Sequence, residues 1–536
     1  MYGQNIHRVE PILLLLLVCI IALALLAKRF KTPYPIVLVI AGLFLSLMPR
    51  MPQIGLNPDV IFLLFLPPLL FSAAVQTSWR DFRFNLVSIS MLALGLVSFT
   101  VYGVAFASKW ILPGFNWHMG IVLGAVVCTT DAIAATAIAE RLGIPKRLTD
   151  IIEGESLVND ASGLLALQIA IAIVMTGHAP PLAERTSRLF YLIFTGIAVG
   201  LVIARIVYWI EKKIDDAPIE ITITIITPYF AYLVAEGLHS SGVIATVACG
   251  IYLGHTTSIY LSTRARLQAT AVWETLTFVL NGIVFMLIEL QLPKVLADIR
   301  SQGIPRLLMR GLLFSAVVIL LRLVWVYPGA WASNWIRRRL LHQPESLPNP
   351  RYVFVLGWTG MRGVVALAAA ISLPVALADG TPFTQRNMII FLTFCVIFVT
   401  LVLQGLSLPF IIRRLGLAGV NPVNPEEEQA RYAMIEAALA YLEEARESDL
   451  PEFKPVYDDL IRVQNHHLNL LPGDRVANTG YRPQDYERFR EISQRIRALE
   501  RAALLNLYNR NKINDAVLRR LERELDLFDV RFANSD

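Results

Sequence analysis

The chain has 536 residues, of which 55% are hydrophobic and 17% charged, whereas an ordinary soluble domain carries about 25% charged residues. A water-soluble core of this length needs far fewer apolar side chains, so the composition excludes an ordinary soluble protein and indicates a chain that crosses a lipid bilayer repeatedly. The formal net charge of +6 is modest and bears on orientation in the membrane, so no nucleic-acid partner is expected.

Apolar spans follow one another along most of the chain when a window of about 19 residues is used. The first is preceded only by Arg8 and ends in AKRFK, which is not a small-residue cleavage site, so we interpret it as a transmembrane helix and not as a cleaved signal. The spans predict an all-α polytopic membrane protein with about thirteen transmembrane helices. Their approximate limits are 10–28, 34–49, 58–76, 84–107, 117–140, 148–177, 187–210, 219–236, 241–256, 268–293, 304–332, 352–378 and 387–412.

Basic residues are distributed unevenly between the loops. With the N-terminus outside, the inside loops carry sixteen lysines and arginines, among them the run Arg337, Arg338 and Arg339, and the outside loops carry eight. The positive-inside rule therefore favours an outside N-terminus and a cytoplasmic C-terminus, in agreement with an odd number of spans.

The composition changes sharply after Arg413 and Arg414, where polar and charged segments with helical periodicity begin. The apolar residues from Ile492 to Leu507 fall at steps of three and four, as in an amphipathic helix. We predict a transmembrane domain over residues 1–415 and a cytoplasmic helical domain over 416–536. The second domain could be a packed appendage, a dimer contact or a regulatory sensor.

Charged residues inside the apolar spans are few, and such residues usually face a water-filled cavity or a partner. In the sixth span, Ser156, Asn159 and Asp160 stand three and four residues apart and share one helix face. Carboxylate, amide and hydroxyl oxygens are the ligands of hard cations, so this face predicts a cation site. The alternative is a polar helix interface. The charged residues at membrane depth are Asp131, Glu153, Glu155, Asp160, Arg205, Glu236, Glu274, Glu289, Arg322 and Arg362.

The fifth span carries Thr129, Thr130 and Asp131 near its middle. Threonine hydroxyls can take over carbonyls freed by an unwound stretch, and non-helical backbone at this depth is tolerated only where it lines a cavity. We predict an interrupted helix here, as in many transporters. Asp131 could ligand a cation, cap the second half-helix at its positive dipole end, or do both.

The twelfth span contains VLGWTGMRGVVALAAAISLP, in which Gly357, Gly360 and Gly363 weaken the helix around Arg362. A buried arginine needs a carboxylate, and guanidinium forms bidentate pairs well. Our hypothesis is that Arg362 pairs with Glu155 and leaves Asp160 free to titrate. The alternative is an arginine that reaches out to the membrane interface.

Enzymatic and metal-cluster motifs are not found in the sequence. The histidines form no metal or nucleophile pattern, and the four cysteines show no CxxC or Cys/His spacing. We expect no enzyme and no cofactor. A cation channel is an alternative to a transporter, although no TVGYG-like filter is present, and a membrane sensor or scaffold acting through the tail is another.

Several motifs in order resemble the monovalent cation/proton antiporters, in the sodium/proton exchanger-like branch with an Asn-Asp pair. They are TTDAIAATAIAE, EGESLVNDASGLLAL, FVLNGIVFMLIELQLP, WTGMRGVVALAAAISLP and LVLQGLSLP. The resemblance implies a fold of thirteen helices with inverted repeats and two interrupted helices, a homodimer in the cell membrane, and elevator-like exchange. It also implies electroneutral exchange of one cation for one proton, with Na⁺ favoured and Li⁺ or K⁺ possible.

The resemblance also implies roles for individual residues. Asp160 would be the cation- and proton-binding carboxylate and Asn159 its partner. Glu155 and Arg362 would form the supporting ion pair. The same site would be lined by Thr130, Asp131 and Ser156.

One position departs from the family pattern. LPPLLFSAAVQ carries Ser72 where many relatives have an acid, so a contribution of that acid to binding or gating is absent or altered here.

The expected mechanism depends on one acid. Desolvation disfavours the charged form of a carboxylate, so Asp160 should hold either a proton or a cation. Each occupant neutralises it, and a bare charge at the membrane centre costs at least about 3 kcal/mol. That cost should suppress crossing of the empty site and couple the two fluxes.

Overall fold

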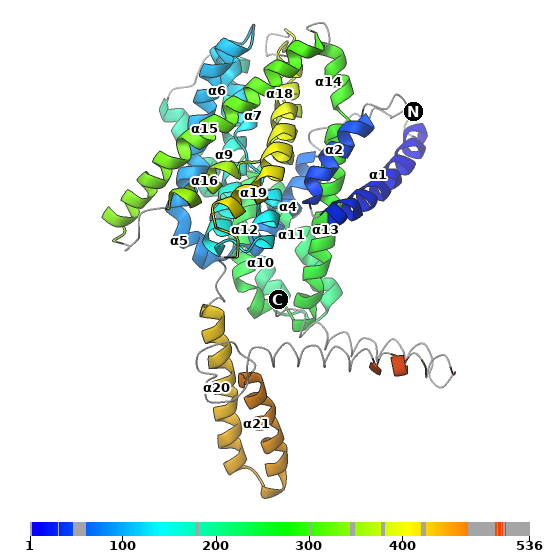
Figure 1. Ribbon diagram of the computed structural model, residues 1–536, viewed down its shortest axis with the longest axis vertical. Coiled ribbons are helices and arrows are strands. Elements are labelled where there is room, and N and C mark those ends of the chain that lie inside the picture. The colour runs from blue at the N-terminus through cyan, green and yellow to red at the C-terminus, as the bar shows by residue number, and fades with distance from the viewer. Residues whose placement is uncertain are drawn as a thin grey trace. The chain divides into compact units, whose positions relative to one another are not determined.

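A computed structural model describes residues 3–30, 32–46, 61–176, 182–299, 303–342, 349–376, 381–419, 425–469 and part of 499–510 (Figure 1). Within these residues the chain is helical, and its β-structure is a single bridge between Ala376 and Pro382. The chain divides into two compact units, Met1–Val420 and Asn421–Asp536. The division lies close to the predicted boundary between 415 and 416.

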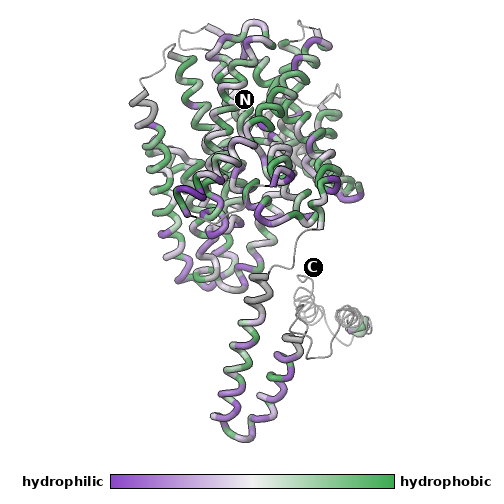
Figure 2. Tube along the Cα trace, turned by 60° about the vertical axis from the view of Figure 1, so that its left-hand side comes forward, coloured by the Kyte–Doolittle hydropathy of each residue, from purple (hydrophilic) through white to green (hydrophobic). Residues whose placement is uncertain are grey.

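Helices of the first unit occupy all thirteen ranges that the hydropathy predicts. Seven described helices are long and apolar enough to cross a membrane, and Figure 2 shows many hydrophobic residues along the helices of the first unit. Shorter apolar helices lie between them, so the number of crossings stays a prediction. The helices are α1 (Gly3–Phe30), α2 (Tyr34–Ser46), α4 (Leu66–Gln76), α5 (Trp79–Ser90), α6 (Val97–Ile111), α7 (Trp117–Val127), α8 (Ile133–Arg141), α9 (Lys146–Thr176), α10 (Leu182–Glu211), α11 (Ala217–Gly237), α12 (Gly242–Tyr260), α13 (Thr263–Glu289), α14 (Leu292–Ile299), α15 (Ile304–Arg339), α16 (Pro350–Trp358), α17 (Val364–Ile371), α18 (Arg386–Val399) and α19 (Gly405–Arg414).

Three spans contain a π-helical turn. One precedes α4 at Ile61–Phe65, one joins α5 to α6 at Met91–Leu96, and one joins α18 to α19 at Thr400–Gln404. Such turns leave backbone groups unevenly paired and are often found at functional sites.

Both predicted helix interruptions are present. The fifth span breaks between the end of α7 at Val127 and the start of α8 at Ile133, and the twelfth breaks between the end of α16 at Trp358 and the start of α17 at Val364. Each break frees carbonyl groups at the end of one half-helix and N–H groups at the start of the next.

Small residues allow close approach of helix backbones, as is usual in membrane bundles. A Cβ at Gly124 of α7 would lie 2.7 Å from the Cα of Val101 in α6, and a Cβ at Gly254 of α12 would overlap the backbone of Val75 in α4. These contacts hold α7 against α6 and α12 against α4.

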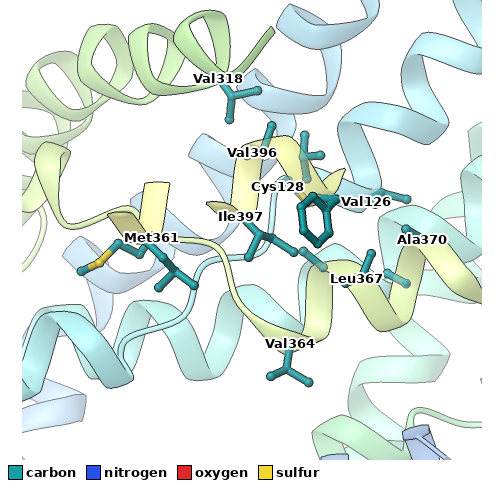
Figure 3. Close-up of a cluster of buried hydrophobic side chains, with 14 of the residues drawn as sticks. Val126, Cys128, Val318, Met361, Val364, Leu367, Ala370, Val396 and Ile397 are labelled. Atoms are coloured by element: carbon teal, nitrogen blue, oxygen red, sulfur yellow. The ribbon is translucent and has the colours of Figure 1, made fainter. Parts of the chain in front are cut away.

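Apolar side chains surround the two interruptions. Val126 of α7, Leu367 of α17 and Ile397 of α18 are at most 2% exposed, and Figure 3 shows them gathered beside Met361 and the neighbouring ends of the half-helices. The polar stretches are therefore surrounded by a hydrophobic core.

The second unit contains a helical hairpin made of α20 (Pro425–Ser448) and α21 (Lys454–Asn469), joined by a 3₁₀ turn. The Tyr457 hydroxyl donates to Asp449 Oδ2 at 2.7 Å, and Arg446 Nε lies 2.8 Å from Asp458 Oδ1. The predicted amphipathic segment from Ile492 to Leu507 lies largely outside the described residues.

Candidate functional site

The two interrupted stretches are joined through their backbones. The Asp131 N–H donates to the Met361 carbonyl at 2.7 Å, and Figure 3 shows the two ribbons losing their helical form beside each other. The interruptions predicted separately from sequence therefore form one structure.

Arg362 crosses from one interrupted helix to the other. Its Nε donates to the Val127 carbonyl at the end of α7 at 3.2 Å, and its Nη1 donates to the Gly360 carbonyl. Its backbone N–H donates to Thr400 Oγ1 at 3.1 Å. Because the C-terminal end of a helix is the negative end of its dipole, Arg362 compensates the end of α7.

The carboxylate of Glu155 is paired with Arg322 and not with Arg362, which corrects our hypothesis. Arg322 Nη2 donates to Glu155 Oε2 at 2.8 Å and Nη1 donates to Oε1, and both side chains are about 1% exposed. Arg362 still interacts with Glu155 electrostatically. The pair is bidentate, the strongest arrangement for these two groups.

Gly360, the first glycine of the WTGMRG motif, explains why Arg322 pairs with Glu155. A Cβ at Gly360 would overlap the Arg322 side chain, so the missing side chain lets Arg322 reach Glu155. The guanidinium also donates to the carbonyls of Leu356 at 2.9 Å and Gly357 at 3.2 Å. The end of α16 is thus compensated by an arginine from α15, as the end of α7 is by Arg362.

The polar face of α9 contacts the non-helical stretch of the fifth span. Ser156 Oγ donates to the Thr130 carbonyl at 2.9 Å, and Asn159 Nδ2 donates to Thr130 Oγ1 at 3.0 Å and to the Cys128 carbonyl at 3.2 Å. Thr130 Oγ1 in turn donates to Glu155 Oε1 at 3.2 Å. Part of this face is therefore a polar helix interface, the alternative that the sequence left open.

Asp131 caps the second half-helix, one of the two roles predicted for it. Its Oδ1 accepts a hydrogen bond from the N–H of Ile133, the first residue of α8, at 2.9 Å. A Cβ at Gly363 would overlap the Asp131 carboxylate, so the same negative charge also lies at the start of α17. Both half-helices present their positive dipole ends to Asp131.

Asp160 differs from the other acids of the site. It is 7% exposed, and no donor among the described residues contacts its carboxylate. The charge of Asp131 acts on it electrostatically. Asp160 is thus a buried carboxylate without a hydrogen-bond donor or a cationic partner among the described residues.

Two further oxygens near Asp160 lack a hydrogen-bond partner within the described residues. Asn159 Oδ1 and Thr129 Oγ1 are both buried, and Thr129 packs on Gly163, one helical turn beyond Asp160. Thr129 was not among the site residues we predicted. Its position next to Thr130 at the break was the available signal.

Ser72 lies on α4 and is buried. Its Oγ accepts a hydrogen bond from Gln76 Nε2 at 3.2 Å, which is a neutral interaction within one helix. Position 72 therefore adds no charge to this chain.

The transmembrane part of the chain matches one known protein family. The model described as "Sodium/hydrogen exchanger, transmembrane" matches residues 13–414. The chain belongs to the sodium/hydrogen exchanger family.

Relatives of this exchanger cover nearly its whole length. An uncharacterized Na⁺/H⁺ exchanger of Mycobacterium tuberculosis is 30% identical over 526 residues, which are 97% of this chain and 95% of the relative. A protein of Bacillus pumilus described as a sodium, potassium, lithium and rubidium/H⁺ antiporter is 33% identical, with 81% and 66% of the two chains covered. A low-affinity Na⁺/H⁺ antiporter of Synechocystis is 32% identical, with 84% and 82% covered.

The solved structure of the sodium proton antiporter MjNhaP1 from Methanocaldococcus jannaschii shares the fold of this exchanger. The TM-score is 0.61 at 19% identity, with 76% of this chain and 99% of the other covered. With the family match over residues 13–414 and relatives at 30% identity or more, the exchanger is an integral membrane protein that exchanges a monovalent cation for protons, as the sequence predicted.

Proposed function

We propose that this exchanger carries one monovalent cation against one proton in each cycle, and that both occupants bind in turn at Asp160. The observation that carries the proposal is the contrast between two buried acids. Glu155 already has the bidentate partner Arg322, whereas Asp160 is buried without a donor among the described residues. An isolated buried carboxylate is costly, so it takes up a proton or a cation.

Oxygens around Asp160 would complete the coordination of the cation. Ser156 Oγ uses its hydrogen for the Thr130 carbonyl, so its lone pairs stay available, and Thr130 Oγ1 keeps one lone pair. Asn159 Oδ1 accepts no hydrogen bond from the described residues. With Asp131 they offer the oxygen ligands that alkali cations require. No resident cofactor is needed.

Neutralisation of Asp160 would couple the two fluxes. A charge at the membrane centre costs at least about 3 kcal/mol, so the site crosses with a proton or with a cation and rarely empty. Glu155 and Arg322 cancel each other and Arg362 lies on helix-end carbonyls, so Asp160 would decide the net charge that moves. One charge exchanged for one charge makes the cycle electroneutral.

The remaining features of the proposal follow the family pattern. The exchanger would lie in the cell membrane as a homodimer, with its N-terminus outside and residues 416–536 in the cytoplasm. The interrupted helices and α9 would move together in an elevator-like step. The cations in the descriptions of the relatives support Na⁺ as the main cation, with Li⁺ and K⁺ as further candidates.

Proteoliposomes loaded with a pH-sensitive dye test the proposal directly. A Na⁺ gradient should move protons in the wild type with the membrane voltage clamped, and Asp160→Asn should abolish that movement while the protein stays folded. Glu274→Gln, which changes an exposed acid of α13, is the matched control and should transport normally. Retained exchange in folded Asp160→Asn would refute the proposal.

A further inference from the structure

A second group of buried acids lies away from the interrupted helices, where α10 ends and α11 begins. Glu211 is the last residue of α10, and Glu220 lies in the first turn of α11. Both residues have 0% exposed surface, and their charges interact electrostatically. Neither residue belongs to the site around Asp160.

Glu220 is well supplied with donors. The backbone N–H of Ser262 donates to its Oε2 and the hydroxyl of Ser262 donates to its Oε1, both at 2.9 Å. Ser262 directly precedes α13, so this contact ties the start of α11 to the start of α13. Both carboxylate oxygens of Glu220 therefore have a hydrogen-bond donor.

Glu211 has no such support. Neither of its carboxylate oxygens accepts a hydrogen bond from any described residue, although both are buried. The titratable side chains that face it from α12 are Cys249 and Tyr260, which are neutral. The only charge facing it from α11 is the like charge of Glu220.

Basic residues nearby do not compensate Glu211. Lys213 Nζ lies 3.5 Å above the ring of Trp209, and Lys212 and Arg264 are exposed.

Tyr208 of α10 packs edge-on against Tyr260 at 5.9 Å between ring centroids. The helix α4, which also packs on α12, has no titratable residue between Leu66 and Gln76.

Two bare carboxylates cannot share this closed space, because a like charge and the loss of water both disfavour ionisation. A metal ion needs several ligands, and no group of three or more His, Cys, Asp or Glu side chains that could hold one is found among the described residues. A single proton meets the requirement, since it removes one charge and needs no further ligand.

We propose that Glu211 is a second proton-binding carboxyl group of this exchanger, outside the transport site, which stays protonated at neutral pH while Glu220 keeps the negative charge. Loss of that proton puts two negative charges between α10, α11 and α12. Alkaline pH should therefore loosen the junction that Glu220 and Ser262 hold at the start of α13. The proposal does not depend on the stoichiometry or the cation of transport.

Infrared difference spectroscopy tests the proton itself. The purified full-length protein should be studied in the Asp160→Asn background, which removes the transport acid. The spectrum at neutral pH should contain the carbonyl band of a protonated carboxylic acid, and Glu211→Gln should remove the intensity of one such group. Glu236→Gln, which changes an exposed acid of α11, should leave the band unchanged. A band that is also unchanged in Glu211→Gln overturns the proposal.

Thermal unfolding across pH gives an independent readout. In the Asp160→Asn background the melting temperature should fall as the pH is raised, and Glu211→Gln should flatten that fall because the amide imitates the neutral acid. Addition of Na⁺ should change neither result. Stabilisation by Na⁺ that depends on Glu211 would assign a metal ion to this position and overturn the proton. Failure of both Glu211→Gln and Glu211→Met to fold would overturn it too, since the position would then require an anion.

Discussion

Two of the places where this exchanger buries acids differ in how the negative charges are balanced. Beside the interrupted helices, Glu155 is neutralised by Arg322 from another helix. At the end of α10, Glu220 is stabilised by the two donors of Ser262 and no arginine takes part within the described residues. In each place one further acid, Asp160 or Glu211, lacks a partner there.

The exposed fraction of the side chain distinguishes Asp160 from Glu211. Asp160 keeps 7% of its surface exposed, whereas Glu211 has none. An acid with access to water can release and rebind ions in every cycle, whereas a fully enclosed acid exchanges its proton only when the packing around it opens. The same chemical group can therefore serve transport in one place and respond to pH in the other.

The largest change in the free energy of unfolding should follow the removal of Arg322. Arg322→Ala leaves Glu155 buried and unpaired, and such a loss costs about 3 to 5 kcal/mol in the free energy of unfolding. In a Glu155→Gln background the same substitution should cost much less. The measurement is thermal or denaturant unfolding of the four proteins of this double-mutant cycle.

Arg362→Ala is the matched control for that cycle, because Arg362 bonds to carbonyls and not to Glu155. Because Arg362 interacts with Glu155 only electrostatically, its cost should change much less between the two backgrounds than the cost of Arg322→Ala does. If Arg322→Ala were equally costly with and without Glu155, the ion pair would contribute no coupling and the correction to our hypothesis would fail.

A smaller effect is expected at Ser262. Ser262→Ala removes the hydroxyl donor of Glu220 and the cap of α13, in which Ser262 Oγ accepts from the Ala265 N–H at 3.2 Å. A hydrogen bond to a charged group contributes about 1.5 to 3 kcal/mol, so the unfolding free energy should fall by that order. Ser262→Thr keeps the hydroxyl and should recover most of the loss. Equal stabilities of the two variants would show that the hydroxyl does not support Glu220.

The smallest effect should be found on the exposed hairpin of the second unit. The Tyr457 hydroxyl holds the pKa of Asp449 below its ordinary value. A lowered pKa in the folded state stabilises the hairpin above the unfolded pKa of about 3.9, and this contribution is lost as the pH falls through the folded pKa.

Tyr457→Phe should therefore raise the pKa of Asp449 toward the ordinary value and weaken the acid sensitivity of the hairpin. NMR titration of labelled aspartates in the full-length protein would measure the shift. The free energy of unfolding at neutral pH should hardly change, since Asp449 is exposed to water and Tyr457 is only half-buried. A pKa of Asp449 that did not move would contradict the role of the Tyr457 hydroxyl.

Much of this fold could be predicted from local sequence. The apolar spans predict the transmembrane helices directly, because every spanning segment must satisfy its backbone hydrogen bonds within a helix. The interruptions at Asp131 and Arg362 were predictable because glycine and threonine at membrane depth weaken a helix. The shared face of Ser156, Asn159 and Asp160 followed from the helical period alone.

The partner of Glu155 could not be predicted in this way. Arg322 and Arg362 are both buried cations inside apolar spans, and the family motif drew attention to Arg362. Which guanidinium reaches the carboxylate depends on the space above Gly360 and on the carbonyls freed at the ends of α7 and α16. Glu211 was overlooked because it stands beside Lys212 and Lys213, where the sequence suggests an ordinary exposed helix end.

The sequence by itself determined that this protein is a helical membrane exchanger and which short stretches carry its polar groups, since helix period and hydropathy are local properties. Only the tertiary structure decided which charges cancel and which acids are left without a partner. Electrostatic compensation depends on distances and burial among side chains that lie far apart in the chain, as the sequence separation of 167 between Glu155 and Arg322 illustrates.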